Sequence, residues 1–164
     1  MNDLFLTRID SPIGRLEIIG DGEAVSALHI ERGGVLPHDG EPERSNPVLD
    51  GAATQLREYF AAKRTVFDVP VRAAGGTAFQ RAVWTELGRL GWGEAVSYGA
   101  LAAAIGKHGS SRAIGGAVGA NPVPIIVGCH RVLGSDGRIT GYSGGEGVST
   151  KLWLLQHEGI GFAA

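Results

Sequence analysis

Cys129 and His130 lie side by side, and their types suggest chemistry more directly than any other pair in this 164-residue chain. Cys129 is the only cysteine, and a thiolate is the form of cysteine that attacks carbon or binds metal. A neighbouring imidazole could help to generate or hold that thiolate. The alternative is a buried cysteine that only fills apolar space, because cysteine is among the most buried residue types. The pair alone does not decide between the two.

Glu158 is a third candidate for the same chemistry. It ends an apolar stretch, residues 150–158, that is predicted to form a helix stopped by Gly159. A carboxylate at the C-terminus of a helix opposes the helix dipole. Its position therefore suggests a specific partner, for which His130 is the candidate, although a solvated terminal carboxylate is the commoner case.

The segment before the cysteine must position it. The apolar run of residues 125–127 follows two prolines and leads into Gly128. A short β-branched run with such borders predicts a buried, strand-like segment. It would hold Cys129 at the end of a rigid element, which is a suitable place for a reactive atom.

The front half of the chain predicts a small α+β support domain, residues 1–76. Three short strands are expected over residues 4–9, 15–19 and 24–30, and the tight turns between them predict an antiparallel meander. A further strand is expected over residues 66–70.

A helix is expected to follow Asn46 as its N-cap, with Pro47 in the first helical position. Its apolar residues Val48, Ala52, Leu56, Tyr59 and Phe60 share one face. Residues 31–46 before it are rich in Gly, Pro and charge and are predicted to form a surface loop, to which no role can be assigned. Residues 73–76 are the expected linker.

The histidines of the front half offer no evident metal site. His29 and His38 have no partners at metal-ligand spacing, whereas a zinc site needs about four ligands. We therefore expect no metal.

The back half, residues 77–164, predicts helices separated by short turns. Thr77 is expected to cap a helix that runs to about Leu90, and Ser97 a shorter one over residues 98–105. A third helix, residues 112–120, follows a glycine-bearing turn with Ser110 or Ser111 as its cap. This arrangement is typical of a helix-turn-helix.

The third helix has an unusual composition for a DNA-reading helix. It contains three glycines, each of which costs up to about 1 kcal/mol in a helix relative to alanine. It has no Asn, Gln or Lys to read base edges. Small residues are explained by close approach either to a DNA groove or to a neighbouring helix, and the composition leaves both open.

A hairpin predicted over residues 132–142 would form a wing beside this helix-turn-helix. The predicted fold class is therefore α+β. It has a small N-terminal domain of antiparallel sheet plus helix, followed by a mostly helical, winged helix-turn-helix C-terminal domain.

Composition limits the environment and the partners. No apolar run approaches the length of a membrane span, the N-terminus lacks the pattern of a signal peptide, and one cysteine fits a reducing compartment. A cytoplasmic protein without a membrane partner is expected. Residues 1–76 carry a net charge of −4 and residues 77–164 one of +2, which is compatible with a polyanion that touches only the back half.

Residues 125–132, IIVGCHRV, resemble the signature of the methylated-DNA–protein-cysteine methyltransferases, also called O6-alkylguanine-DNA alkyltransferases. The resemblance covers nearly all of the back half in order. It also includes Tyr98, residues 112–117, Asn121-Pro122, residues 142–145 and residues 153–159.

The resemblance implies a DNA repair protein without a cofactor. Double-stranded DNA containing O6-alkylguanine would be its partner, with O4-alkylthymine as a further substrate, and a monomer is expected. The damaged base would be flipped out of the duplex, and Cys129 would take the alkyl group irreversibly in a single turnover. The alternatives are a damage sensor without chemistry and a cysteine hydrolase, although adjacent Cys and His give a poor geometry for the latter.

The resemblance also assigns roles by matching position. Cys129 would be the acceptor, His130 would act with Glu158 through a water to generate the thiolate, Tyr98 would protonate the departing guanine, and Asn121 would brace the turn. Arg112 would fill the gap left by the flipped base. DNA contacts would come from Tyr98, Gly99, Lys107, Gly115, Gly116, Ala117 and Ser135, and the base pocket from Val132, Tyr142 and Ser143.

The chain departs from the family pattern immediately before the cysteine, where the usual proline is replaced by Gly128. Glycine is more flexible, so we expect a reduced rate of transfer and not a loss of function.

Overall fold

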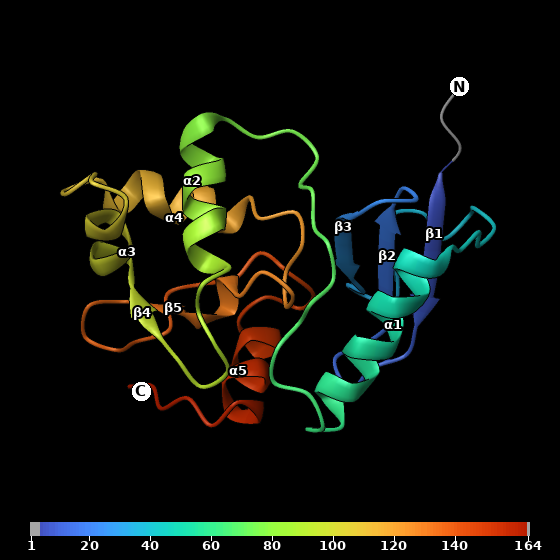
Figure 1. Ribbon diagram of the computed structural model, residues 1–164. Coiled ribbons are helices and arrows are strands. Elements are labelled where there is room, and N and C mark those ends of the chain that lie inside the picture. The colour runs from blue at the N-terminus through green and yellow to red at the C-terminus, as the bar shows by residue number, and fades with distance from the viewer. Residues whose placement is uncertain (1–3, 164) are drawn as a thin grey trace.

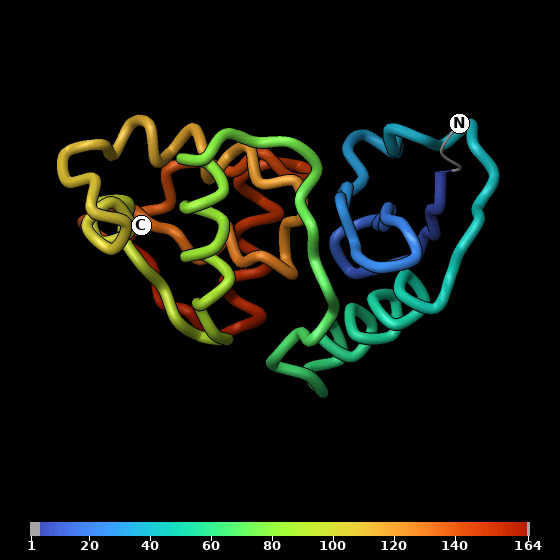
Figure 2. The backbone as a smooth tube through the Cα atoms, turned by 45° about the horizontal axis from the view of Figure 1, so that its top comes forward, coloured from blue at the N-terminus to red at the C-terminus, as the bar shows by residue number. Residues whose placement is uncertain are grey.

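The computed structural model describes residues 4–163, and it has two lobes (Figures 1 and 2). One lobe holds a three-stranded sheet and helix α1 (Pro47–Phe60), and the other holds the remaining helices. The chain that follows α1 passes between the lobes. The ends of the two expected domains, at residues 1 and 164, lie outside the described residues.

The sheet of the N-terminal lobe is the predicted antiparallel meander. Strands β1 (Phe5–Ile9), β2 (Leu16–Gly20) and β3 (Val25–Ile30) follow one another in the order β1-β2-β3. Four consecutive residues of β2, from Leu16 to Ile19, are buried. Because successive side chains of a strand point to opposite faces, both faces of this sheet are covered near its centre.

Helix α1 covers one face of the sheet. The Asn46 side chain accepts a hydrogen bond from the Leu49 N–H, and Pro47 starts the helix, as predicted. The buried stripe is shifted slightly from the predicted one, because Val48 and Phe60 are only partly buried. Its members are Leu49, Ala52, Ala53, Leu56 and Tyr59.

The strand predicted over residues 66–70 is wrong. This segment forms only a single bridge just beyond its end, between Val25 and Val71. The Val25 N–H donates to the Pro70 carbonyl and the Arg72 N–H to the Val25 carbonyl, while Pro70 itself has no N–H to donate. Residues 66–70 therefore form no strand of the sheet.

Local sequence signals place the first helices of the C-terminal lobe. Helix α2 (Ala78–Leu87) begins with a capping box between Thr77 and Gln80, and Ser97 caps α3 (Tyr98–Ala104). Helix α4 (Ser111–Gly119) has Ser110 at its N-cap without a side-chain bond. The α3–α4 pair thus has the predicted helix, turn, helix order.

The wing predicted over residues 132–142 is not a hairpin. Strand β5 (Val132–Leu133) pairs in parallel with β4 (Val96–Ser97). Within the described residues, the rest of the 132–142 segment forms no second strand. Residues 134–138 instead close a tight turn, in which the Gly134 N–H donates to the Arg138 carbonyl at 2.8 Å. The last helix is α5 (Val148–His157). Over residues 4–163, no helix combines the length and the apolar character needed to cross a membrane.

The two lobes share a hydrophobic core. Val123 and Ile125, which belong to the loop before the cysteine, are fully buried in the same cluster as Ile18 and Leu28 of the sheet. The Leu28 N–H also donates to the Pro122 carbonyl at 2.9 Å. The N-terminal lobe therefore supports the loop that leads to Cys129.

Candidate active site

The loop that presents Cys129 is not the strand that the sequence predicts. Ile125 has a φ of 73°, a left-handed conformation that β-branched residues rarely adopt. Asn121 holds the loop at two points, because its Nδ2 donates to the Val127 carbonyl at 2.9 Å and its Oδ1 accepts from the Val123 N–H at 3.1 Å. A turn stabilised by one side chain thus replaces the expected extended run.

Gly128 is the centre of a tight turn. The Cys129 N–H donates to the Val127 carbonyl at 2.8 Å, and Gly128 has φ −75° and ψ 57°, the dihedrals of an inverse γ-turn. A short 3-10 helix, η1 (Cys129–Arg131), begins at once. The turn and the helix fix the direction of the cysteine side chain.

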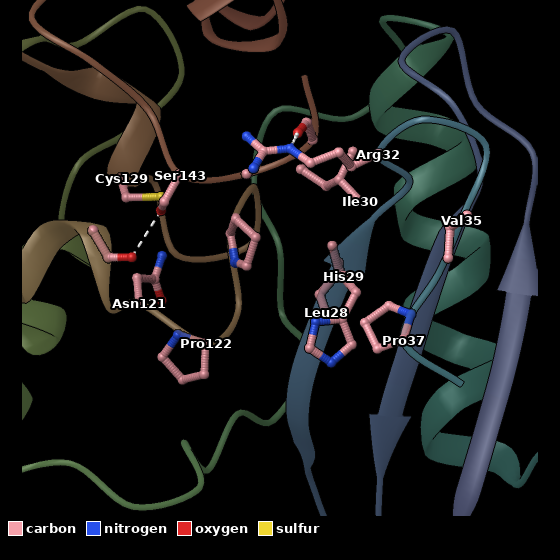
Figure 3. Close-up of a pocket in the computed structure, with 14 residues that line it drawn as sticks. Leu28, His29, Ile30, Arg32, Val35, Pro37, Asn121, Pro122, Cys129 and Ser143 are labelled. Carbon is pink, nitrogen blue, oxygen red and sulfur yellow. Dashed lines mark hydrogen bonds between the residues drawn. The ribbon is translucent and has the colours of Figure 1, made fainter. Parts of the chain in front are cut away.

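Cys129 lies between two cavities and is only 5% exposed. The larger cavity, of about 520 Å³, separates the lobes and is bordered by Asn121, Ser143 and residues 28–30 of the sheet (Figure 3). The smaller, of about 340 Å³, lies beside α4 and is lined by Tyr98, Gly115, Gly119, Thr140, Tyr142, Ser143 and Lys151. The sulfur can therefore be reached by a ligand although it is mostly covered.

Burial raises the pKa of the Cys129 thiol, and hydrogen bonding with Asn121 and Tyr142 opposes that effect only in part. The Tyr142 hydroxyl lies 3.8 Å from Sγ. The sulfur is therefore a protonated thiol at rest, and a base is needed to make it nucleophilic.

His130 and Glu158 form the predicted pair, and their contact is direct. His130 Nε2 lies 2.6 Å from Glu158 Oε2, and both side chains are buried. A carboxylate only accepts hydrogen bonds, so Nε2 carries the hydrogen. Nδ1 then holds a free lone pair, and this buried atom has no hydrogen-bond partner in the described structure. Burial lowers the pKa of His130 although Glu158 opposes this effect, so the ring is neutral at rest and Nδ1 is unprotonated.

Glu158 is the most heavily bonded carboxylate of the site. Arg131 binds it with Nε at 2.8 Å and Nη2 at 3.1 Å, and the Tyr59 hydroxyl donates to Oε2 at 2.6 Å. Burial alone would raise the pKa of Glu158, but the hydrogen bonds from His130, Arg131 and Tyr59 outweigh it and hold the pKa well below its usual range. The acid is therefore ionised at neutral pH.

Three of the residues around the site are not among the sequence candidates. Arg131 directly follows His130 in the sequence, so its position next to the candidate pair indicates a residue of the site. Tyr59 belongs to α1, ninety-nine residues from Glu158, and no local pattern connects the two. Lys151 is 1% exposed and donates from Nζ to the Val132 carbonyl at 2.6 Å and the Gly141 carbonyl at 3.2 Å. Burial lowers its pKa to about 8.

The residues expected at the base pocket surround the smaller cavity in part. Tyr142 and Ser143 line it, and the Ser143 hydroxyl donates to the Gly119 carbonyl at 2.7 Å. Tyr98, at the start of α3, accepts a hydrogen bond from Thr140 at 3.0 Å. Val132 is buried, with its carbonyl bound by Lys151.

The residues expected to touch DNA lie mostly on the surface. Arg112, in the first turn of α4, is exposed, as are Gly99, Lys107, Gly116 and Ser135. Gly115 is half-buried at the rim of the smaller cavity. Ala117 is the exception and corrects the expectation. Its side chain is 2% exposed, and its carbonyl accepts a hydrogen bond from Trp84 at 2.8 Å, so this residue packs α4 against α2.

Comparisons with known proteins agree across both lobes. Residues 78–160 match the profile of the 6-O-methylguanine DNA methyltransferase DNA binding domain, and residues 4–73 that of the ribonuclease-like domain of the same family. The chain is 47% identical over 122 residues to the methylated-DNA–protein-cysteine methyltransferase of Salmonella typhimurium, covering 74% of this chain and 70% of the relative. It is 43% identical over 155 residues to that of Mycobacterium tuberculosis, covering 92% and 89%.

Solved structures give the same result. The crystal structure of Mycobacterium tuberculosis O6-methylguanine methyltransferase superposes with a TM-score of 0.83 at 40% identity, covering 95% of this chain and 93% of that one. The Mycobacterium tuberculosis OGT in complex with DNA gives 0.84 at 41% identity, covering 94% and 93%. Because two profiles of one family match residues 4–73 and 78–160 and the relatives named above agree over most of their length, the chain belongs to the methylated-DNA–protein-cysteine methyltransferase family.

Proposed function

We propose that this protein repairs O6-alkylguanine in double-stranded DNA by transferring the alkyl group to Sγ of Cys129. Family membership carries the activity, methyl transfer from DNA to a cysteine of the protein itself. The assignment to Cys129 is supported by one observation above all: the only sulfur nucleophile of the chain borders a cavity large enough for a base and adjoins a neutral, buried imidazole.

The reaction needs a proton acceptor and a proton donor. The thiol proton leaves Cys129 and reaches the free Nδ1 of His130, through a water as the family resemblance implies. Glu158 stabilises the resulting imidazolium through its contact with Nε2. The sulfur then attacks the alkyl carbon while the bond from that carbon to O6 breaks, and the electron pair of that bond stays with guanine.

Tyr98 protonates the departing guanine. Its hydroxyl reaches the smaller cavity and already accepts a hydrogen bond from Thr140, which leaves the phenolic hydrogen free to donate. The product is a thioether, a stable bond that nothing in the site is built to cleave. Each molecule therefore acts once.

DNA is held by α4, with the small-residue surface at Gly116 close to the backbone and Arg112 in the place of the flipped base. The absence of base-reading side chains on this helix suits a protein that must act at any sequence. We also propose that the protein acts as a monomer, because Cys129, His130, Glu158 and Tyr59 come from one chain.

The test is an intact-mass measurement after incubation with duplex DNA that contains O6-methylguanine. The expected result is one added methyl group per chain, located at Cys129 by fragmentation. A methyl group on another residue, or continued turnover without modification, would contradict the proposal. The Cys129→Ser variant is the control: it should bind the damaged duplex but leave it unrepaired.

A further inference from the structure

The N-terminal sheet carries a cluster of metal-ligating side chains that takes no part in the chemistry proposed for Cys129, although one member, His29, lines the larger cavity. Glu17 of β2 and His29 of β3 are direct cross-strand partners, so both side chains project from the same face. His38 reaches that face from the loop of residues 31–46. Its Nδ1 lies 2.7 Å from Glu17 Oε1, and the ligand atoms of all three residues lie within 4.8 Å of one another.

The burial of Glu17 makes this cluster unusual. Its side chain is fully buried, and a buried carboxylate is costly unless it is well bonded. Oε1 has His38, but Oε2 has no hydrogen-bond partner in the described structure, and its nearest cation is Nε of Arg8 at 3.5 Å. The carboxylate thus has unused capacity beside two half-buried imidazoles.

We propose that Glu17, His29 and His38 bind one divalent transition-metal ion, with zinc as the best fit. Two imidazoles and one carboxylate are a ligand set that zinc accepts, with water in the fourth position. Tetrahedral zinc at its usual bond lengths places ligand atoms about 3.4 Å apart. Zinc binding would therefore require the distance between His38 Nδ1 and Glu17 Oε1 to increase from 2.7 Å. The longer distances among the three ligand atoms, which reach at most 4.8 Å, would have to decrease. Side-chain rotations can supply both shifts.

The arrangement also explains why the sequence does not reveal it. The spacing of His29 and His38 in the sequence gives no metal-ligand pattern, because the third proposed ligand is a glutamate on the neighbouring strand. Its pairing with His29 depends on the register of the sheet. The position of His38 depends on how the 31–46 loop folds over that face.

A metal here would fix the 31–46 loop. Arg8 binds the loop through the carbonyls of His38 and Glu41. At its other end the loop contacts the C-terminal lobe: Arg32 Nε donates to the Gly145 carbonyl at 2.7 Å, and the Gly33 N–H to Glu146 at 2.6 Å. In Figure 3 His29 lies across the larger cavity from Cys129, and the Arg32 side chain extends from the same side toward the C-terminal lobe. The metal is therefore a structural ion that holds one wall of this cavity.

Zinc binding by the full chain is the test. Cys129 is itself a zinc ligand by chemistry, so every protein carries Cys129→Ser and is stripped with a chelator before titration with zinc by calorimetry. His29→Ala and His38→Ala are compared with His108→Ala, which removes an exposed histidine between α3 and α4. Thermal unfolding with and without zinc is the second readout.

The expected result is one zinc ion per chain, at least tenfold weaker binding in His29→Ala and in His38→Ala, and unchanged binding in His108→Ala. At a hundredfold excess of zinc over its Kd, the melting temperature should rise by about 5 °C or more in the parent protein. It should not rise in the two cluster variants. Failure of the parent to bind zinc, or equal binding in all three histidine variants, would overturn the proposal.

Discussion

Replacing Glu158 with Gln tests whether the negative charge behind His130 drives the reaction. The substitution preserves the size of the side chain and an acceptor oxygen for Nε2, but it removes the charge. General-base assistance is worth about 10²- to 10⁴-fold in rate, so we expect the rate of methyl transfer to fall within that range. The same change leaves the buried guanidinium of Arg131 without its counter-charge, and breaking a buried ion pair costs about 3–5 kcal/mol in the free energy of unfolding.

Tyr59→Phe is the matched control, because it removes a hydrogen bond to the same oxygen, Oε2, but leaves the charge. A hydrogen bond to a charged group contributes about 1.5–3 kcal/mol, so this variant should lose about 2 kcal/mol of stability. Oε2 then binds Nε2 of His130 at least as strongly, and the rate of transfer should change by less than about threefold.

The assay is single-turnover transfer from methylated duplex DNA, followed by intact mass, at a temperature where urea unfolding shows both variants to be folded. The two variants separate stability from chemistry, because both are destabilised and only one loses the charge. An unchanged rate in Glu158→Gln, or equal losses of rate in the two variants, would refute the role given to the carboxylate.

Three further predictions follow from other parts of the structure. Arg112→Ala should slow transfer from duplex DNA at least about tenfold, but not transfer from the free base O6-methylguanine, because only the duplex needs base extrusion. An equal effect on both substrates would argue against that role. Gly128→Pro should leave the rate unchanged or raise it, since φ of −75° suits proline. A Cβ there would lie 2.9 Å from Arg131 Nη1, so urea unfolding should show a loss of about 1 kcal/mol, and a large loss of rate would contradict the expectation. The free energy of unfolding should fall as pH drops from about 7 to 5, because burial lowers the pKa of His130 and only the unfolded chain takes up a proton in that range. Urea titrations should show a weaker pH dependence of this free energy in His130→Asn. An unaltered pH dependence would show that other groups cause it.

The features predicted correctly from the sequence are those determined locally. The caps at Asn46, Thr77 and Ser97 depend on side chains that bond to the backbone within three residues. The partnership of His130 with Glu158 was inferred from the unfavourable position of a carboxylate at a helix end, and the direct contact confirms it.

The features that the sequence did not reveal depend on distant contacts. Residues 125–127 look like a strand, yet Ile125 adopts a left-handed conformation, and its side chain is buried in the core that the two lobes share. Val132–Leu133 pairs with a strand from before α3 and not with the residues that follow it. The bond from Tyr59 to Glu158 joins the two lobes, and no local pattern could have predicted it.

The conformation of Ile125 has a consequence for how this protein can change. A non-glycine residue held at positive φ costs on the order of 1–3 kcal/mol and persists only where its surroundings impose it, and here the sheet of the opposite lobe contributes those surroundings. A substitution at Leu28 that changes the packing of the sheet would therefore change the orientation of Cys129 Sγ without direct contact between the two residues. Mutations far from any nucleotide should thus appear as changes in reaction speed, and natural variants of the sheet should be accompanied by matching changes at Val123 or Ile125.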